Sequence, residues 1–230
     1  MSKTIVVVGF GPGISSAVAE KFGAAGFSVA LVARSQDRLD AGVEALKAKG
    51  VTAAAFPADA GDPAAIRAAI GQARAALGPI AVLHWNAYSG GGVTDLVTDD
   101  PAQVGHVFDI AIVGLLAAVQ AALPDLKAAG DGAILVTNGA FGELNPMVDA
   151  LVIGMKVVGV GLANTAKHRL VGLLAERLKG DGVYVGEVMV AGVVKGTAYD
   201  SGAGSIEASD IADKFWELYQ ARGEIRARIS

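Results

Sequence analysis

The chain has 230 residues, of which 53% are apolar and 18% are charged, and its formal net charge is −4. A chain of this length and composition can bury one large core, which excludes intrinsic disorder and fits a single globular domain. The acidic balance and the lack of a Lys/Arg cluster argue against a nucleic-acid partner. The sequence contains no cysteine, so disulfides, thiolate catalysis and Cys-based zinc sites are excluded. Its three separated histidines show no metal-ligand spacing, and we expect no metal.

The N-terminus lacks the charged, apolar and small-residue regions of a signal peptide, because Met-Ser-Lys leads directly into a strand pattern. The longest apolar stretches are 110–123 and 151–162. Both are short for a membrane span, and they contain Gln120 and Lys156 respectively. We therefore expect a soluble, cytoplasmic protein with no membrane partner.

Strand and helix patterns alternate along the whole chain. In chain order the predicted strands are Thr4–Gly9, Ser28–Ala33, Val51–Pro57, Ile80–Trp85, Ala133–Asn138 and Val183–Val190. The first three predicted helices run over 14–25, from the Ser35 cap to Gly50, and from Asp62-Pro63 to Leu77. A fourth begins at Asp100-Pro101 and runs toward Leu123, and a long fifth helix follows the fifth strand and ends near Gly180. A last helix begins at the Ser209-Asp210 cap. This order predicts one α/β domain over residues 1–230, with a doubly wound, mostly parallel sheet and helices on both faces.

The turn after the first predicted strand is rich in glycine. The sequence VVVGFGPGIS places Gly9, Gly11 and Gly13 between a buried strand and a helix that begins at Ile14. Glycine permits a tight turn and a close backbone approach, and the N-terminus of the following helix favours anions. The pattern predicts a cradle for the pyrophosphate of a dinucleotide, and the alternative is a turn that simply requires glycine.

Polar residues follow the next three predicted strands. Arg34 and Ser35 follow the second strand, where an arginine can pair with a 2′-phosphate. Asp59 follows the third strand, where a carboxylate can reach an adenine amine. Asn86 and Ala87 follow the fourth strand, beside the point at which such sheets bind ligands. These positions favour NADP(H) over NAD(H) as the cofactor.

Taken in order, these motifs resemble the short-chain dehydrogenase/reductase family over essentially the whole chain. GFGPGIS resembles the family's glycine turn with Ser15 in place of its third glycine, VARS resembles the same segment of NADP-preferring members, and VLHWNAY resembles the Asn-Asn-Ala-Gly segment. GVYVGEVMVAGVVKGT is similar to the sixth strand and its following loop, which implies that Gly192, Val194 and Thr197 lie near the nicotinamide. The resemblance implies a Rossmann-type fold with seven strands.

The catalytic residues that the resemblance implies are largely missing. Members of the family use a serine, an asparagine and a Tyr-x-x-x-Lys pair, in which the lysine lowers the pKa of the tyrosine that transfers the proton. The position that matches the asparagine is Ala111. The position that matches the serine is Gly139, with Asn138 beside it.

The Tyr-x-x-x-Lys pair can be placed in two registers. In the first register the tyrosine position is Val152 and the lysine is Lys156. In the second register the positions are Ala163 and Lys167, which requires an insertion of about eleven residues. Neither register contains a tyrosine, so the usual proton path is missing.

Three residues are candidates for the missing chemistry. Lys156 can bind the nicotinamide ribose, or act as an acid if burial lowers its pKa, although it can also be a lysine that snorkels from an apolar helix. Asn138 can hydrogen-bond a substrate oxygen, but an amide is a poor acid. Tyr88 lies in a loop that can border the nicotinamide, or it packs beneath that loop.

Three functional hypotheses follow. The first is an NADP(H)-dependent oxidoreductase that acts on an unknown carbonyl or alcohol with a non-standard proton donor. The second is a catalytically impaired protein that binds NADP(H) as a sensor or scaffold, and the third has lost the nucleotide as well. The substrate pocket would be formed by the loops Ser89–Asp99 and Gly196–Ser205, and we expect the second loop to be mobile. Their small polar residues do not indicate which substrate is bound. The resemblance and the apolar helices around 101–123 and 150–179 predict a homodimer or homotetramer.

Overall fold

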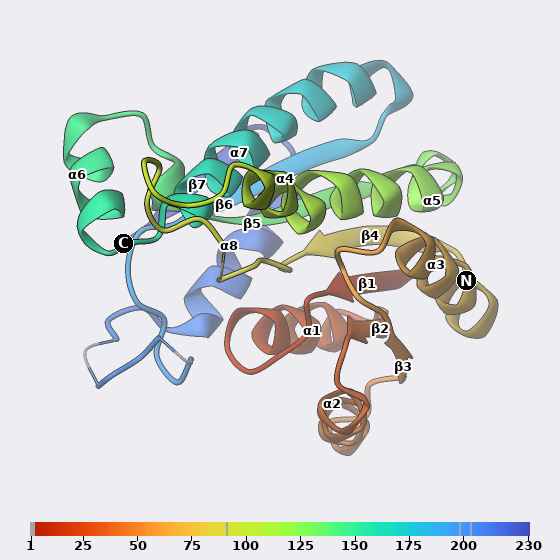
Figure 1. The fold of residues 1–230 in the computed structure, drawn as a ribbon. Coiled ribbons are helices and arrows are strands. Elements are labelled where there is room, and N and C mark those ends of the chain that lie inside the picture. Colours follow the sequence, from red (N-terminus) through yellow and green to blue (C-terminus); the bar gives the residue numbers. More distant parts are fainter. Residues whose placement is uncertain (1–2, 91, 198, 203) are drawn as a thin grey trace.

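The computed structural model describes residues 3–90, 92–197, 199–202 and 204–230, which fold around one seven-stranded sheet (Figure 1). The strands lie in the order β3-β2-β1-β4-β5-β6-β7, and every neighbouring pair is parallel. Their bounds are β1 Thr4–Val8, β2 Ser28–Ala33, β3 Ala53–Pro57, β4 Ile80–Trp85, β5 Ala133–Gly139, β6 Tyr184–Val190 and β7 Arg226–Ile229. The predicted α/β fold is confirmed, with a sheet that is parallel throughout.

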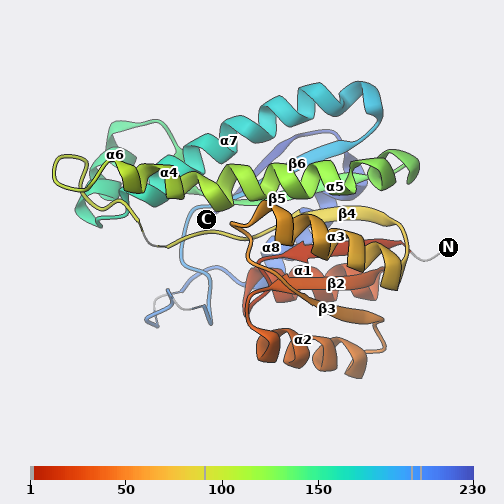
Figure 2. The same cartoon turned by 45° about the vertical axis from the view of Figure 1, so that its right-hand side comes forward.

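Helices cover both faces of the sheet (Figures 1 and 2). Their bounds are α1 Ile14–Ala24, α2 Gln36–Ala48, α3 Pro63–Leu77, α4 Ala102–Phe108, α5 Leu115–Ala128, α6 Pro146–Gly154, α7 Val158–Leu178 and α8 Ala208–Ala221, with short helical segments η1 Asp109–Gly114, η2 Ala140–Gly142 and η3 Lys179–Asp181. One core lies between the sheet and α1, α2 and α8, and a second lies between the sheet and α3, α5 and α7. Successive residues of β1 alternate between them, because Ile5 and Val7 face the first core whereas Val6 and Val8 face the second.

The sheet changes its winding direction at β1, which pairs with β2 on one side and with β4 on the other. In open α/β sheets, ligands bind in the crevice outside the carboxyl ends of the strands at such a point. The loops that follow β1, β4 and β5 therefore frame the region in which a site is expected.

The long helix predicted after β5 is instead two helices. Lys156, between α6 and α7, adopts a φ of 55°, a left-handed conformation that interrupts the helical path. α6 begins at Pro146, and the Asn145 side chain caps it by accepting hydrogen bonds from two backbone N–H groups. At the other end of the chain, α8 begins at Ala208 without a side-chain cap, slightly before the predicted Ser209-Asp210 start.

The helical region after β4 contains a π-helical segment, η1, between α4 and α5. Gly114 at the end of η1 packs against the backbone after β3, since a Cβ built on Gly114 would lie 1.8 Å from the Ala60 carbonyl oxygen. The two backbones thus approach each other as closely as glycine allows. Ala60 lines the cavity described below, so this contact helps to place one of its walls.

The stretch Ala102–Ala128 is long and apolar enough to cross a membrane, judged by length and composition alone. It is longer than the apolar runs considered in the sequence analysis because η1 joins α4 and α5 into one helical path. Its segments pack against α3, β4 and α7, as a core helix of a water-soluble protein does. The length and apolar composition of this stretch are therefore only weak evidence for a membrane span.

Replacing Gly114 by alanine should lower the free energy of unfolding by about 2–3 kcal/mol, because the new methyl group would collide with the Ala60 carbonyl and separate the two backbones. Gly105→Ala on α4 is the matched control. A Cβ at Gly105 would meet nothing within 4 Å, so the better helix former should stabilise the protein by up to about 1 kcal/mol. Urea denaturation measures both changes, and wild-type stability in Gly114→Ala would contradict the close contact.

Candidate functional site

A cavity of about 420 Å³ lies at the carboxyl ends of β1 to β4. Its lining comes from segments far apart in the sequence: Val8–Phe10, Val32–Ser35, Arg38, Ala58–Ala60, Asn86–Tyr88, Gly90 and Ile110. The structure thus brings together six residues that the sequence analysis assigned to the cofactor: Gly9, Arg34, Ser35, Asp59, Asn86 and Ala87. A cavity at this place in the sheet is where a dinucleotide is expected.

Two glycines shape the turn between β1 and α1. Gly9 has a φ of 85°, and a Cβ there would lie 2.4 Å from the backbone nitrogen of Ala87. Gly13 has a φ of 96°, and a Cβ there would lie 2.7 Å from the Thr197 methyl carbon. Both positions therefore require glycine for conformation and for space.

Ser15 replaces the third glycine of the turn without entering the cavity lining. Its buried hydroxyl accepts a hydrogen bond from the Gly11 N–H and donates one to the Gly11 carbonyl, each at 2.9 Å. The Ser15 hydroxyl thereby ties the first turn of α1 to the Gly11 backbone in the preceding turn. Ile14 begins α1, and the described residues provide no side-chain cap there, so the first N–H groups of the helix are available to an anion.

Two arginines follow β2 at the edge of the cavity. Arg34 was expected from the sequence, but Arg38 was not singled out. Arg38 lies in the first turn of α2, where the Ser35 hydroxyl accepts a hydrogen bond from its backbone N–H. Neither guanidinium has a hydrogen-bond or ion-pair partner in the part of the chain that the structure describes, and both are exposed. No sequence signal separates Arg38 from other solvated arginines in the first turn of an exposed helix.

Asp59 and Asn86 also line the cavity, from the carboxyl ends of β3 and β4. The Asp59 carboxylate is exposed and accepts a hydrogen bond from the Gly61 N–H at 2.9 Å. The Asn86 amide nitrogen lies 3.4 Å from the Gly9 carbonyl oxygen, which ties the end of β4 to the glycine turn. Both side chains keep oxygen atoms that a ligand can reach.

The loop after β6 covers the glycine turn at one point, where Thr197 meets Gly13. The Thr197 hydroxyl donates to the Val194 carbonyl at 2.8 Å, whereas the Val194 side chain is buried in the core. Gly192 is exposed at the start of this loop, and Ile206 packs beside it. Residues 198 and 203 of the predicted mobile loop Gly196–Ser205, and residue 91 of the predicted substrate loop, lie outside the described residues.

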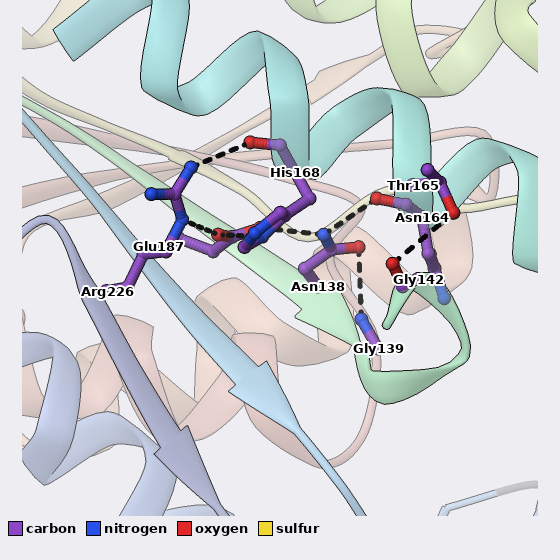
Figure 3. A network of polar contacts seen from close by, with 8 residues as sticks. All are labelled: Asn138, Gly139, Gly142, Asn164, Thr165, His168, Glu187 and Arg226. Atoms are coloured by element: carbon purple, nitrogen blue, oxygen red, sulfur yellow. Dashed lines mark hydrogen bonds and ion pairs between the residues drawn. The ribbon is translucent and has the colours of Figure 1, made fainter. Parts of the chain in front are cut away.

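A buried polar network lies at the carboxyl end of β5 (Figure 3). Glu187 on β6 is 0% exposed, and its carboxylate bonds to three side chains. The Asn138 amide donates to it at 2.7 Å, His168 Nδ1 lies at 2.7 Å, and Arg226 Nε donates at 3.3 Å. None of these contacts was foreseen, because the partners come from β5, α7 and β7.

Asn138 is fully engaged by this network. Its amide nitrogen also donates to the Asn164 carbonyl at 3.0 Å, and its oxygen accepts from the Gly139 N–H at 3.0 Å. The side chain is 2% exposed. The expected hydrogen bond from Asn138 to a substrate oxygen is therefore not supported, since the residue instead holds α7 against β5.

Two polar residues of α7, Asn164 and Lys167, are buried beside this network. Asn164 and Lys167, three residues apart on one helix face, are 6% and 3% exposed. Burial lowers the pKa of Lys167 to about 8, although the Glu187 carboxylate acts in the opposite direction. Lys167 is thus a buried ammonium on the helix that packs against β5 and β6.

These positions favour the second register of the Tyr-x-x-x-Lys pair. Ala163 and Lys167 share one helix, one turn apart, whereas Val152 lies in α6 and Lys156 lies in the turn after it. Lys156 is exposed, so burial does not prepare it as an acid. The assignment of Lys156 to the site, made in the first register, is therefore not supported by the geometry.

Tyr88 lies at the rim of the cavity with 53% of its surface exposed. Its ring centroid is 6.0 Å from that of Tyr199 in the loop after β6. Partial burial and the interaction with Tyr199 raise the pKa of Tyr88 well above its usual value. A tyrosine with a raised pKa is a weak proton donor near neutral pH.

Residues 3–199 match the family model of the short chain dehydrogenases. The chain belongs to the short-chain dehydrogenase/reductase family. It is 28% identical over 174 residues to the 3-oxoacyl-(acyl-carrier-protein) reductase FabG of Staphylococcus aureus, a match that covers 74% of this chain and 69% of that protein. It is also 34% identical over 134 residues to the 3-dehydrosphinganine reductase TSC10A of Arabidopsis thaliana, covering 56% and 39% of the two chains. This membership makes the chain an NAD(P)-dependent short-chain dehydrogenase-like enzyme.

Solved structures share the fold over the full length. A metagenomic short-chain oxidoreductase in complex with NADP is 27% identical, with a TM-score of 0.79 over 100% of this chain and 97% of that one. An NADPH-bound short chain oxidoreductase from Pseudomonas aeruginosa PAO1, which contains an atypical catalytic center, has a TM-score of 0.85 at 21% identity, over 100% and 97% of the two chains. The second likeness is one of fold alone.

Lys167→Met should raise the free energy of unfolding at pH 7 by about 1–3 kcal/mol, because methionine keeps the apolar stem and removes a buried charge. The folded-state pKa of Lys167, about 8, lies below the ordinary value of 10.5, so the charge destabilises the fold fully below pH 8. This cost disappears as the pH rises toward 10.5. The difference in free energy of unfolding between the variant and the wild type should therefore shrink between pH 8 and 10.

Denaturant unfolding at several pH values measures this gap. Arg169→Met is the matched control, because Arg169 is an exposed basic residue on the same helix. A Lys167→Met variant that is less stable than the wild type at pH 7 would show that the ammonium contributes favourable contacts after all.

Proposed function

We propose that the protein is an NADP(H)-dependent oxidoreductase that interconverts a carbonyl and an alcohol. The observation that carries this proposal is the pair Arg34 and Arg38, two exposed guanidinium groups that line the cavity without partners among the described residues. Two such groups suit the 2′-phosphate that distinguishes NADP(H) from NAD(H). Similar solved structures hold NADP or NADPH, which supports the same cofactor.

The other parts of the cavity fit the rest of this dinucleotide. Gly9 and Gly13 add no side chain to the β1–α1 turn, and the uncapped start of α1 at Ile14 favours the pyrophosphate. Asp59 would accept a hydrogen bond from the adenine amine at the end of β3. By the family's pattern, the nicotinamide would lie toward the loop that contains Thr197.

When bound, the dinucleotide supplies or accepts a hydride, and the chain must hold the carbonyl and exchange a proton at its oxygen. The usual tyrosine is absent in both registers. Lys156 is exposed in a turn, Asn138 is committed to the network, and Tyr88 has a raised pKa. We infer that the non-standard donor comes from another residue beside β5 and α7.

A cofactor-binding sensor or scaffold with little redox activity is the second candidate. It is favoured by the small residues that stand at the family's catalytic positions, Ala111, Gly139 and Ala163. Both candidates require NADP(H) binding, so turnover of a carbonyl distinguishes them.

We also propose that the protein forms a homodimer or homotetramer through α4, η1, α5 and α7. Val113 on η1 and Leu173 on α7 are 43% and 52% exposed, although their helices also build the second core. A second copy of the chain would cover these apolar side chains.

Arg34→Asp should weaken NADPH binding by at least about 10-fold and leave NADH binding nearly unchanged, because it replaces a charge-assisted bond to the 2′-phosphate with repulsion. Nicotinamide fluorescence during titration measures both affinities. Arg169→Asp is the control and should change neither affinity, because Arg169 is exposed on α7 and does not line the cavity. Equal losses for the two nucleotides would show that Arg34 does not contact a 2′-phosphate.

The wild-type protein should oxidise NADPH when given one of three carbonyl probes: 2,3-butanedione, acetoacetyl-coenzyme A or 9,10-phenanthrenequinone. The expectation is that turnover depends on the carbonyl and is faster with NADPH than with NADH. Absorbance of the reduced nicotinamide reports the rate. Tight NADPH binding without oxidation by any probe would favour the sensor or scaffold, and no binding at all would remove both candidates.

A further inference from the structure

Two polar side chains beside β5 are largely buried, and their polar atoms keep some access to solvent but bond to no protein group among the described residues. The Asn164 amide and the Lys167 ammonium form no side-chain hydrogen bond or ion pair within the described ranges, although they are 6% and 3% exposed. Buried polar groups in proteins are nearly always paired, and an unpaired ammonium is especially costly. Two such groups on one helix face suggest that their partner is a ligand atom.

The Asn164 amide occupies the space that a side chain at residue 139 would fill. A Cβ built on Gly139 would lie 2.6 Å from Asn164 Nδ2, so the glycine is what makes room for the amide. Figure 3 shows the Asn164 side chain reaching from α7 toward the segment that contains Gly139 and Gly142. The amide donor therefore stands at the carboxyl end of β5, next to the end of β4 that lines the cavity.

The surrounding network fixes this arrangement. Asn138 donates to the Asn164 carbonyl at 3.0 Å, which holds this turn of α7 against the end of β5. The Glu187 carboxylate is already bonded to Asn138, His168 and Arg226, and it forms no ion pair with Lys167. Lys167 is thus held near a negative charge without being neutralised by contact.

Most other charged groups on the elements around α7 form ion pairs with one another, and Arg169, which forms none with a described residue, is exposed. His168 and Arg226 face Glu187, and Arg226 also donates to the His168 carbonyl at 3.2 Å. Further pairs are Glu143 with Arg228, beside η2 and β7, and His106 with Asp109, on α4 and η1. At the far end of α7, Asp181 of η3 pairs with Arg177 and Lys127. Among these groups, Lys167 is the buried one that retains an uncommitted proton.

We propose that Lys167 is the proton donor of the carbonyl reduction and that Asn164 polarises the carbonyl by donating a hydrogen bond to its oxygen. This assignment rests on the proposed oxidoreductase function. As the carbonyl carbon accepts the hydride, the C=O π electrons move to the oxygen, and that oxygen takes a proton from the Lys167 ammonium. The products are the alcohol and a neutral amine, which regains its proton from water. In alcohol oxidation the neutral amine removes the same proton.

The charge state of Lys167 suits this role. Its pKa, lowered by burial to about 8, leaves the group mainly protonated at pH 7 yet able to release a proton. Reduction needs the protonated form, so its rate should fall about tenfold per pH unit above pH 8. Oxidation needs the neutral form and should show the opposite dependence.

The first test does not require activity. Lysine labelled with ¹³C at Cε reports the protonation of each ammonium by NMR, and Lys167→Met identifies the resonance of Lys167. The expected result is one lysine that titrates near pH 8 in the nucleotide-free protein. A Lys167 resonance that titrates above pH 10, like an exposed lysine, would overturn the assignment.

The second test measures the single-turnover rate at saturating NADPH with the fastest of the three carbonyl probes. Lys167→Met should lower that rate at pH 7 by at least about 100-fold, and Asn164→Ala by at least about 10-fold. Lys167→Arg keeps the positive charge but cannot release a proton, so it should be as slow as Lys167→Met. Gly139→Ala should reproduce the effect of Asn164→Ala, because its methyl group displaces the amide. Arg169→Met is the control and should keep the wild-type rate.

The outcomes separate the two proposals. Wild-type reduction that persists in Lys167→Met or Lys167→Arg, with its fall above pH 8 intact, overturns the donor assignment and leaves the oxidoreductase function standing. NADPH binding without reduction of any probe by the wild type overturns the oxidoreductase function and this assignment with it. Loss of NADPH affinity in Lys167→Arg equal to its loss of rate would mean that Lys167 only anchors the cofactor, which also overturns the donor role.

Discussion

The half of the site beside β5 depends on one buried carboxylate. Glu187 is fully enclosed on β6, and it bonds to Asn138 of β5, His168 of α7 and Arg226 of β7. A buried carboxylate that loses a partner costs about 3–5 kcal/mol, so these elements have a strong reason to keep one arrangement. Asn138, oriented by this carboxylate, in turn holds the backbone of Asn164. The position of α7 relative to β5 therefore depends on a single buried charge, that of the Glu187 carboxylate.

The half beside β1 and β4 is held together by different physics. Here backbones meet without intervening side chains, as Gly9 does with Ala87 and Gly114 with Ala60. The absence of side chains leaves room for a dinucleotide, and positive charge enters only at the rim, through Arg34 and Arg38. Close backbone contacts thus shape the cradle, whereas a polar network holds α7 against β5 and β6.

Local patterns predicted most of the fold and the cradle, because β-branched runs, helix caps and clustered glycines act over a few residues. Arg38 was missed because an arginine in the first turn of an exposed helix looks like any solvated residue. The break at Lys156 was missed because a positive φ at a lysine has no sequence signature. Asn138 was read as a substrate contact because its partner Glu187 lies 49 residues away. Periodicity within a single element cannot reveal long-range pairing of this kind.

The two halves of the site come from separate stretches of the chain. The cavity lining ends at Ile110, whereas the network around Glu187 begins at Asn138. No residue of α7 or β6, which are both described throughout, lines the cavity, so a substitution in these elements leaves the lining itself unchanged. A protein with this division can keep its dinucleotide-binding cavity while the residues beside β5 and α7, including a proton donor, are exchanged. Gly139 marks where the two halves differ, because the space beside it is filled by the Asn164 amide of α7.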